Sequence, residues 1–319
     1  MRILLSDVAH RAYGRALTER FPSASFAVMA RDGAFTTPIG DARENPVEIA
    51  WATHDLFVEG PFRDFFRVSA ASPSLRWFQS SGAGVDSPFF VGLIERGVAV
   101  TTSDAASIPI AEFVMRSVLQ WFQKPQRWED QRGERSWRHH FFREVANTEW
   151  LVVGMGSIGT EVATRARAFG AHIVGVRRHP IGGEPVDAMI SPADLLVAAT
   201  SADVVVVSAP ATAETHHLID KPFLSVMKPN SVIVNIARGS LVDQDALIAA
   251  LDTGCPELAI LDTVEIEPPP RDSVLWTHPR VVLTPHNSFA GDGTTRRNAT
   301  LFMDNLDRYI AGDPLLNRV

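Results

Sequence analysis

A chain of 319 residues is about twice as long as a typical domain of roughly 150 residues, so we expect two domains. Its 45% hydrophobic and 21% charged residues exclude a disordered or fibrous chain, and the single cysteine, Cys255, excludes a disulfide-stapled secreted protein and a cysteine zinc site. A formal net charge of −7, no dense basic stripe and no run of roughly 18 apolar residues predict a cytoplasmic protein that binds neither nucleic acid nor membrane.

The first hundred residues alternate short apolar runs with amphipathic stretches. Runs that are apolar almost throughout are typical of parallel strands covered on both faces of the sheet. The runs that predict strands are 2–7, 25–30, 47–52, 75–81 and 98–103. Between them, 11–21 and 88–96 have helical spacing, so we expect β-α-β units here.

A longer helix and a segment without periodicity follow. Pro109 suits the first turn of a helix, and apolar residues recur at helical intervals as far as Phe122, which predicts a helix over 109–122. The next residues, up to 144, are charged and aromatic without a clear period, and we expect a loop or an arm there.

The second half begins with a strand, a glycine-rich turn and a helix. The strand at 150–154, the helix at 160–169 and the strand at 172–176 form one β-α-β unit. A C-terminal helix over 294–310 ends before Gly312. Further apolar runs predict strands at 204–210, 231–237, 258–264 and 281–286. This half is therefore expected to be a doubly wound parallel sheet.

The glycine-rich turn has the spacing G-x-G-x-x-G, formed by Gly154, Gly156 and Gly159. The first glycine permits a tight turn, the second lets the backbone approach a pyrophosphate, and the third allows close contact between helix and strand. The N-terminus of the helix that follows offers unpaired N–H groups to an anion. Glycines also end strands for purely structural reasons, but the placement between a strand and a helix predicts a dinucleotide site.

Two arginines, Arg177 and Arg178, follow the next strand, where NAD-binding chains place an acidic residue for the ribose hydroxyls. A carboxylate there would repel a 2′-phosphate, whereas a guanidinium can hold it through paired, charge-assisted hydrogen bonds. We therefore expect NADP(H) to be preferred, with NAD(H) possible. The alternative is that both arginines are solvated residues at a strand end.

Three later segments place a polar residue just after an apolar strand, where doubly wound sheets gather their ligands. They carry Arg238 within NIARGSLVD, Glu267 before a proline, and His286 within TPH. This order resembles the D-2-hydroxyacid dehydrogenase family, whose members carry N-x-A-R-G-x-x-V-D, an acid preceding proline and a histidine in T-P-H. Further similarities to the family are MKPN at 227–230, PATAET at 210–215 and GAGVD at 82–86.

The resemblance implies reduction of a 2-keto acid, and three residues suit that chemistry. Arg238 would bind the carboxylate and polarise the keto carbonyl where negative charge develops. His286 would donate the proton to the keto oxygen, and Glu267 would favour the protonated imidazole at neutral pH. Glu265 is a rival for the acid, and Glu267 is preferred because a proline follows it as in the family.

The resemblance also implies positions that bind the cofactor and the substrate. Asp262 matches the residue that positions the nicotinamide amide, and the backbone N–H groups of Ala83 and Gly84 match those that hold the substrate carboxylate. Trp51, after the third strand, either lines the substrate pocket or fills the core. Trp137 lies in a segment that some relatives insert into a partner's active site. The expected cofactor-binding residues are Gly154, Gly156, Ser157, Ile158, Gly159, Arg177, Arg178, Ala209, Pro210, Thr215, Ala237 and Asp262.

No metal site is expected. The pairs His139/His140 and His216/His217 are the groupings most suggestive of metal ligands. Adjacent residues do not share a helix face, and no carboxylate cluster joins either pair at ligand spacing.

In the family the C-terminal helix closes the first domain. The resemblance therefore implies an α/β fold of two doubly wound parallel-sheet domains. A flavodoxin-like substrate domain would comprise 1–100 and 288–319, and an inserted Rossmann dinucleotide-binding domain would comprise 101–287. The resemblance also implies a homodimer.

The leading hypothesis is an NADP-dependent oxidoreductase that reduces a small 2-keto acid, with glyoxylate or hydroxypyruvate favoured. A second hypothesis is an NAD(P)-sensing, corepressor-like binding protein with little turnover, because some relatives use the cofactor mainly to set assembly. A third is an NAD-dependent enzyme of the same fold.

Overall fold

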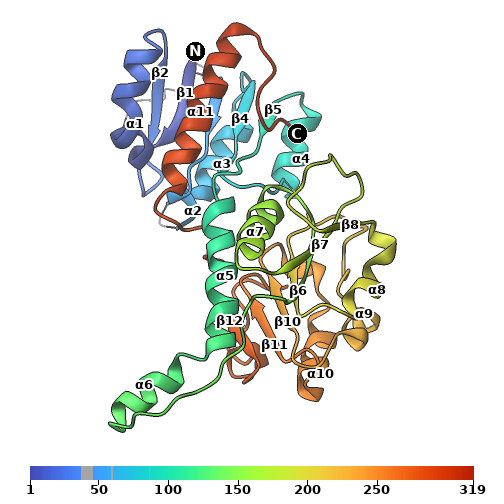
Figure 1. The fold of residues 1–319 in the computed structure, drawn as a ribbon. Helices are drawn as coiled ribbons and strands as arrows, with labels where there is room; N and C mark the ends of the chain where they lie inside the picture. Colours follow the sequence, from blue (N-terminus) through green and yellow to red (C-terminus); the bar gives the residue numbers. More distant parts are fainter. Residues whose placement is uncertain (37–45, 59, 86) are drawn as a thin grey trace. The chain divides into compact units, whose positions relative to one another are not determined.

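The computed structural model describes residues 1–36, 46–58, 60–85 and 87–319, and the chain divides into two compact units (Figure 1). Unit 1 comprises Met1–Ala106 and Asp292–Val319, and unit 2 comprises Ser107–Gly291. The boundaries expected from the sequence, after residues 100 and 287, lie a few residues before the observed ones. Asp86 of the GAGVD motif lies outside the described residues.

Unit 1 is built on a parallel sheet with the strand order β2-β1-β3-β4-β5, which is that of flavodoxin-like sheets. Each strand predicted for this unit is present, and each is shorter than the apolar run that contains it. The strands are β1 (Arg2–Ser6), β2 (Ser25–Met29), β3 (Ile49–Trp51), β4 (Trp77–Gln79) and β5 (Ala99–Thr101). The helices between them are α1 (Asp7–Arg20), α2 (Asp55–Val58), α3 (Phe62–Ala71) and α4 (Pro88–Glu95).

The C-terminal helix α11 (Thr294–Ala311) returns to unit 1 and packs on its sheet. Its Phe302 ring stacks on Trp51 at 4.3 Å and on Trp77 at 5.2 Å between ring centroids. Trp51 is fully buried and donates from Nε1 to Asn298 Oδ1 at 2.8 Å. Trp51 is therefore a core residue, and its predicted place in the substrate pocket is wrong because its ring and its N–H group are both engaged inside unit 1.

Unit 2 contains a parallel sheet in the order β12-β11-β10-β9-β6-β7-β8. Counted from β8, the first six strands follow the order 3-2-1-4-5-6 of dinucleotide-binding sheets. The central strands are buried along their whole length, as expected for short apolar runs covered on both faces. Strand β8 was not predicted, because its short run Ala188–Ile190 contains a single β-branched residue, whereas the other edge strand, β12, begins with two valines.

The bounds of these elements are as follows in chain order. The strands are β6 (Glu149–Val153), β7 (His172–Val176), β8 (Ala188–Ile190), β9 (Val204–Val207), β10 (Val232–Asn235), β11 (Leu258–Leu261) and β12 (Val281–Leu283). The α-helices of the unit's body are α5 (Ser107–Gln123), α7 (Ser157–Ala168), α8 (Leu195–Ala199), α9 (Lys221–Val226) and α10 (Gln244–Thr253). Short 3₁₀ turns are η1 (Pro192–Asp194), η2 (Gly239–Leu241) and η3 (Val274–Trp276).

Residues 124–144 form an arm that projects from unit 2 (Figure 1). Its first part is a helix, α6 (Gln126–Gly133), so the alternative of an irregular loop is wrong there. None of the residues of α6 is buried, and the sequence therefore carries no apolar period that could reveal the helix. The returning part leaves Trp137 and Phe141 93% and 103% exposed.

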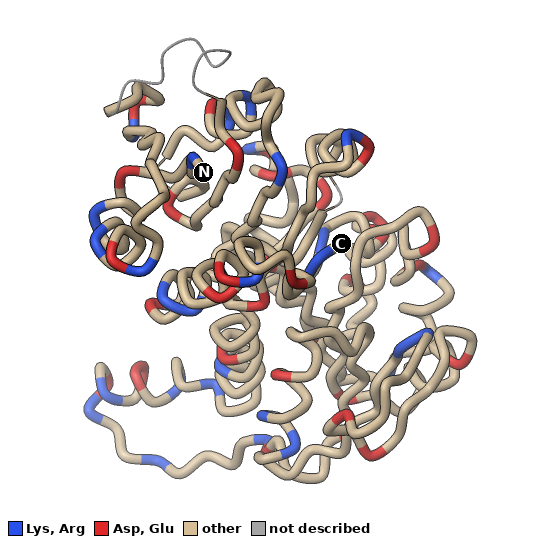
Figure 2. The backbone as a smooth tube through the Cα atoms, turned by 90° about the horizontal axis from the view of Figure 1, so that it is seen from above, with Lys and Arg blue, Asp and Glu red and all other residues tan. Residues whose placement is uncertain are grey.

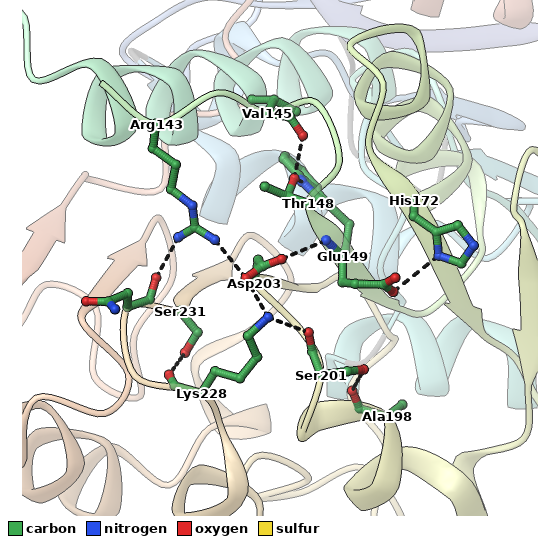
Figure 3. A network of polar contacts seen from close by, with 12 residues as sticks. Arg143, Val145, Thr148, Glu149, His172, Ala198, Ser201, Asp203, Lys228 and Ser231 are labelled. Carbon is green, nitrogen blue, oxygen red and sulfur yellow. Dashed lines mark hydrogen bonds and ion pairs between the residues drawn. The ribbon is translucent and has the colours of Figure 1, made fainter. Parts of the chain in front are cut away.

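The two ends of the arm are fastened together at its base. The Arg143 N–H group donates to Phe122 O at 3.2 Å, and the Arg143 guanidinium lies over the Phe122 ring, 4.4 Å from its centroid. Arg143 Nη2 and Lys228 Nζ each lie 2.7 Å from Asp203 Oδ1 (Figure 3). The Glu149 N–H group donates to Asp203 Oδ2 at 2.8 Å. Asp203 therefore joins the base of the arm to the amino ends of β6 and β9.

The contacts of Asp203 predict a loss of stability in acid. Burial raises the pKa of Asp203, but the hydrogen bonds from Lys228 and Glu149 and the charge of Arg143 outweigh it and hold the pKa below its ordinary value of 3.8. A carboxyl group with a lowered pKa in the folded state stabilises the fold above its ordinary value, and that contribution is lost as pH falls through the folded value. We expect Asp203→Asn to lower the free energy of unfolding by about 1–3 kcal/mol at neutral pH and to flatten its dependence on acid below about pH 4.

Calorimetric unfolding across the acid range measures this effect. Asp313→Asn, which changes an exposed carboxylate, is the matched control and should behave as the wild type. If wild type and Asp203→Asn lost stability equally in acid, Asp203 would not hold the base of the arm by its charge.

Lys and Arg are interspersed with Asp and Glu along the backbone (Figure 2). No helix of the described residues is long and apolar enough to cross a membrane. In the same part of the chain, no three His, Cys, Asp or Glu side chains lie together as metal ligands would. The absence of nucleic-acid, membrane and metal partners stays a prediction.

Candidate active site

Arg238, Glu267 and His286 all follow strands that are neighbours in the sheet of unit 2. Arg238 comes shortly after β10, Glu267 after β11, and His286 after β12. These three strands are parallel and consecutive in the sheet, so their carboxyl ends share one edge. The fold therefore brings groups that are far apart in sequence to one place.

His286 and Glu267 form a hydrogen-bonded pair. His286 Nδ1 lies 2.8 Å from Glu267 Oε2, and the Val264 N–H group donates to Oε1 at 3.1 Å. Burial raises the pKa of Glu267, but the contact with His286, the Val264 N–H group and the charge of Arg238 outweigh it, so the pKa lies below its usual value. Glu267 is thus an ionised partner at neutral pH, and Nε2 is the imidazole nitrogen that can meet a substrate.

Asp262 fixes the turn that carries His286. Its buried carboxylate accepts hydrogen bonds from Thr284 Oγ1 at 2.7 Å, Asn287 N at 2.9 Å and Ser288 Oγ at 2.5 Å. His286 has a left-handed φ of 48°, which costs a residue other than glycine about 1–3 kcal/mol and persists where neighbouring contacts hold it. The roles of Thr284 and Ser288 were not predicted from the sequence, although a hydroxyl two residues on each side of His286 is a signal that could have indicated them. The contact of Asp262 with nicotinamide stays a prediction.

Arg238 lies on a turn that packs against the segment before Glu267. Asn235 Nδ2 donates to Arg238 O at 2.9 Å, which folds the chain back after β10. A Cβ on Gly239 would lie 1.9 Å from the backbone carbon of Val264, so only glycine lets the two segments touch. The positions of the guanidinium and of the Glu267 carboxylate are therefore coupled through backbone contact.

Glu265, the rival of Glu267, has a different partner. Its Oε1 lies 2.8 Å from His217 Nε2, and the His217 ring stacks on that of His216. Two carboxylates that are neighbours in sequence thus serve two different histidines. The preference for Glu267 as the partner of His286 agrees with this geometry.

The glycine turn after β6 has the shape that a pyrophosphate needs. Gly154 has a φ of +103°, and a Cβ there would lie 2.6 Å from the backbone of Ala209. A Cβ on Gly159 would lie 2.0 Å from Gly154 O. Gly156 differs, because nothing lies within 4 Å of an added Cβ, and this open space adjoins the N-terminus of α7. The turn therefore fits a dinucleotide phosphate.

Arg177 and Arg178, at the end of β7, have different partners. Arg177 Nη1 donates to Met155 O in the glycine turn at 2.6 Å and lies 3.9 Å from Glu184 Oε1. Arg178 Nη1 lies 2.5 Å from Glu214 Oε2. Arg177 is therefore engaged with the glycine turn, whereas Arg178 is paired with an exposed carboxylate and stays more than half exposed.

Thr215 shapes the loop after β9. Its Oγ1 donates to Pro210 O at 2.7 Å and accepts a hydrogen bond from Thr212 N at 2.8 Å. Ala209 and Ala237 are nearly buried beside the ends of β9 and β10. Binding roles stay predictions for the glycine turn with Ser157 and Ile158, for Arg177 and Arg178, for Ala209, Pro210, Thr215 and Ala237, and for Ala83 and Gly84 in unit 1.

Residues 115–288 match the family model described as D-isomer specific 2-hydroxyacid dehydrogenase, NAD binding domain. The chain is 33% identical over 258 residues to a D-3-phosphoglycerate dehydrogenase of Methanocaldococcus jannaschii, a match that covers 77% of this chain and 48% of that protein. It therefore spans about half the length of that curated relative.

Two further similarities cover most of both chains. Glyoxylate/hydroxypyruvate reductase B of Enterobacter agglomerans is 32% identical over 254 residues, which are 77% of this chain and 78% of that protein. A solved D-isomer specific 2-hydroxyacid dehydrogenase of Xanthobacter autotrophicus Py2, in complex with NADPH and MES, has a TM-score of 0.76 at 28% identity and is matched over 100% of this chain and 98% of its own. With the site geometry, these matches establish that the chain belongs to the D-isomer specific 2-hydroxyacid dehydrogenase family of NAD(P)-dependent oxidoreductases.

Proposed function

We propose that the protein is an NADPH-dependent oxidoreductase that reduces a small 2-keto acid, with glyoxylate and hydroxypyruvate as the preferred substrates. The observation that carries this proposal is the His286–Glu267 pair. The charge of Arg238 helps to lower the pKa of the Glu267 carboxyl group. The similarity to a protein named glyoxylate/hydroxypyruvate reductase B supports the substrate class. A cytoplasmic location, expected from the single cysteine, stays a prediction.

The three side chains supply the charge and the proton that reduction of a keto group requires. When bound, the dinucleotide supplies the hydride to the keto carbon. Arg238 would hold the carboxylate of the keto acid and place positive charge where the keto oxygen becomes negative. His286 would protonate that oxygen from Nε2, while Glu267 holds Nδ1 and balances the charge of the imidazolium. In the reverse direction, neutral His286 would accept the hydroxyl proton.

The cofactor preference rests on Arg177 and Arg178. Both lie at the end of the strand after the glycine turn, where a carboxylate would favour NAD(H) instead. The NADPH complex of the similar Xanthobacter autotrophicus protein supports the same choice.

Oxidation of NADPH in the presence of a panel of 2-keto acids tests the proposal. We expect turnover with glyoxylate or hydroxypyruvate and a lower KM for NADPH than for NADH. No turnover with any keto acid would contradict the proposed reaction. If NADPH then still bound and changed the oligomeric state, the corepressor-like alternative would be favoured, and a lower KM for NADH would favour the NAD-dependent one.

We also propose a homodimer in which the arm contacts the partner subunit. Trp137 and Phe141 are almost fully exposed on the arm, and large exposed aromatic side chains are typical of association surfaces. Changing both to serine is expected to shift the protein from dimer to monomer in light scattering. Changing the exposed Phe57 of unit 1 to serine is the control and should leave the dimer intact. A monomeric wild type would contradict the proposal.

A further inference from the structure

Glu214 holds one of the two arginines that are proposed to bind the cofactor. Strand β6, which ends in the glycine turn, lies between β7 and β9 in the sheet. Arg178 follows β7 and Glu214 follows β9, so their ion pair joins the loops on either side of the glycine turn. The two side chains are 55% and 71% exposed.

Arg177 and Arg178 are not equivalent in this arrangement. Arg177 donates to Met155 O at 2.6 Å and is 32% exposed, so its guanidinium holds the glycine turn in shape. Turning Arg177 toward a ribose would break its hydrogen bond to the Met155 carbonyl oxygen. The partner of Arg178 is an exposed carboxylate, and exposed ion pairs are weak, so Arg178 can exchange its partner at little cost. Arg178 is therefore the guanidinium that can move to a phosphate.

We infer that Glu214 is a specificity-determining residue, which competes with the 2′-phosphate of NADPH for Arg178. The inference rests on the proposed NADPH preference. While Glu214 is paired with the Arg178 guanidinium, a phosphate can bind Arg178 only by displacing the Glu214 carboxylate. The freed carboxylate then lies near the phosphate and repels it. NADH carries no 2′-phosphate, so its binding does not require Arg178 to leave Glu214. Glu214 thus weakens NADPH binding and leaves NADH binding unchanged.

Equilibrium binding of each cofactor to the full chain without substrate tests this inference. Glu214→Gln removes the charge with little change in shape, and we expect it to lower the Kd for NADPH by about three- to tenfold. The Kd for NADH should stay within about twofold of wild type. The gain should shrink as salt is raised, because salt screens exposed charges. Glu19→Gln, which breaks an exposed Glu–Arg contact in unit 1 at 2.7 Å, is the matched control and should change neither Kd.

A double variant separates competition from simple repulsion. Arg178→Gln should raise the Kd for NADPH by more than about tenfold. In that background, Glu214→Gln should bring a much smaller gain in NADPH affinity, since only repulsion of the phosphate remains and there is no guanidinium to compete for. An equal gain in both backgrounds would overturn the inference, because Glu214 would then act by repulsion alone.

The same titrations distinguish failure of this inference from failure of the proposed function. Wild type that binds neither cofactor would contradict the proposed function. Wild type that binds NADH more tightly would contradict the cofactor preference and the inference with it. Wild type that prefers NADPH while Glu214→Gln leaves the Kd unchanged would overturn the role of Glu214 alone.

Discussion

Replacing His286 with glutamine is expected to lower kcat for keto-acid reduction by about two to four orders of magnitude, with a much smaller change in KM. A glutamine amide can still donate a hydrogen bond to Glu267, but it cannot give up a proton to the keto oxygen. The charge of Arg238 remains, so keto-acid binding should persist. Steady-state kinetics at saturating NADPH, with a single-turnover measurement of the chemical step, would measure the two effects separately.

A second histidine–glutamate pair provides the control for this variant. His172 Nδ1 lies 3.2 Å from Glu149 Oε2 at the amino ends of β7 and β6, the sheet edge opposite the candidate site (Figure 3). His172→Gln alters a similar contact, and kcat should stay within about twofold of wild type. If His286→Gln kept kcat within about tenfold of wild type, His286 would not be the proton donor.

The elements that could be predicted from the sequence are those that bury apolar side chains. Strand β9 is a run of four buried valines, and such a run indicates a covered parallel strand by itself. Helix α6 buries none of its residues and so leaves no apolar period, and the run of edge strand β8 is short and has a single β-branched residue. Hydrophobic periodicity indicates which side chains are buried, so it cannot reveal an element such as α6 that buries none of its residues.

The sequence predicted which residues would lie together in the candidate site, but it did not predict most of their partners. The carboxyl ends of parallel strands share one edge of the sheet, and this rule, with the family resemblance, predicted that Arg238, Glu267 and His286 lie together. Which of two nearby carboxylates meets His286 depends on loop shape, and no spacing rule predicts that Glu265 meets His217. The place of Trp51 could not be predicted either, because its ring packs on Phe302 of helix α11, far along the chain.

Replacing Arg238 with glutamine is expected to lower kcat/KM for the keto acid by about three orders of magnitude, with both a raised KM and a lowered kcat. The raised KM follows from loss of the cation that holds the carboxylate, and the lowered kcat from loss of positive charge at the developing oxyanion. Arg238→Lys keeps the charge but not the planar pair of donors, so it should recover only part of the loss. The Kd for NADPH and the thermal unfolding temperature should be close to wild type in both variants, which separates a catalytic role from a structural one. A wild-type kcat/KM in Arg238→Gln would mean that another cation binds the substrate. Arg238 would then have only a structural role beside Glu267 and His286.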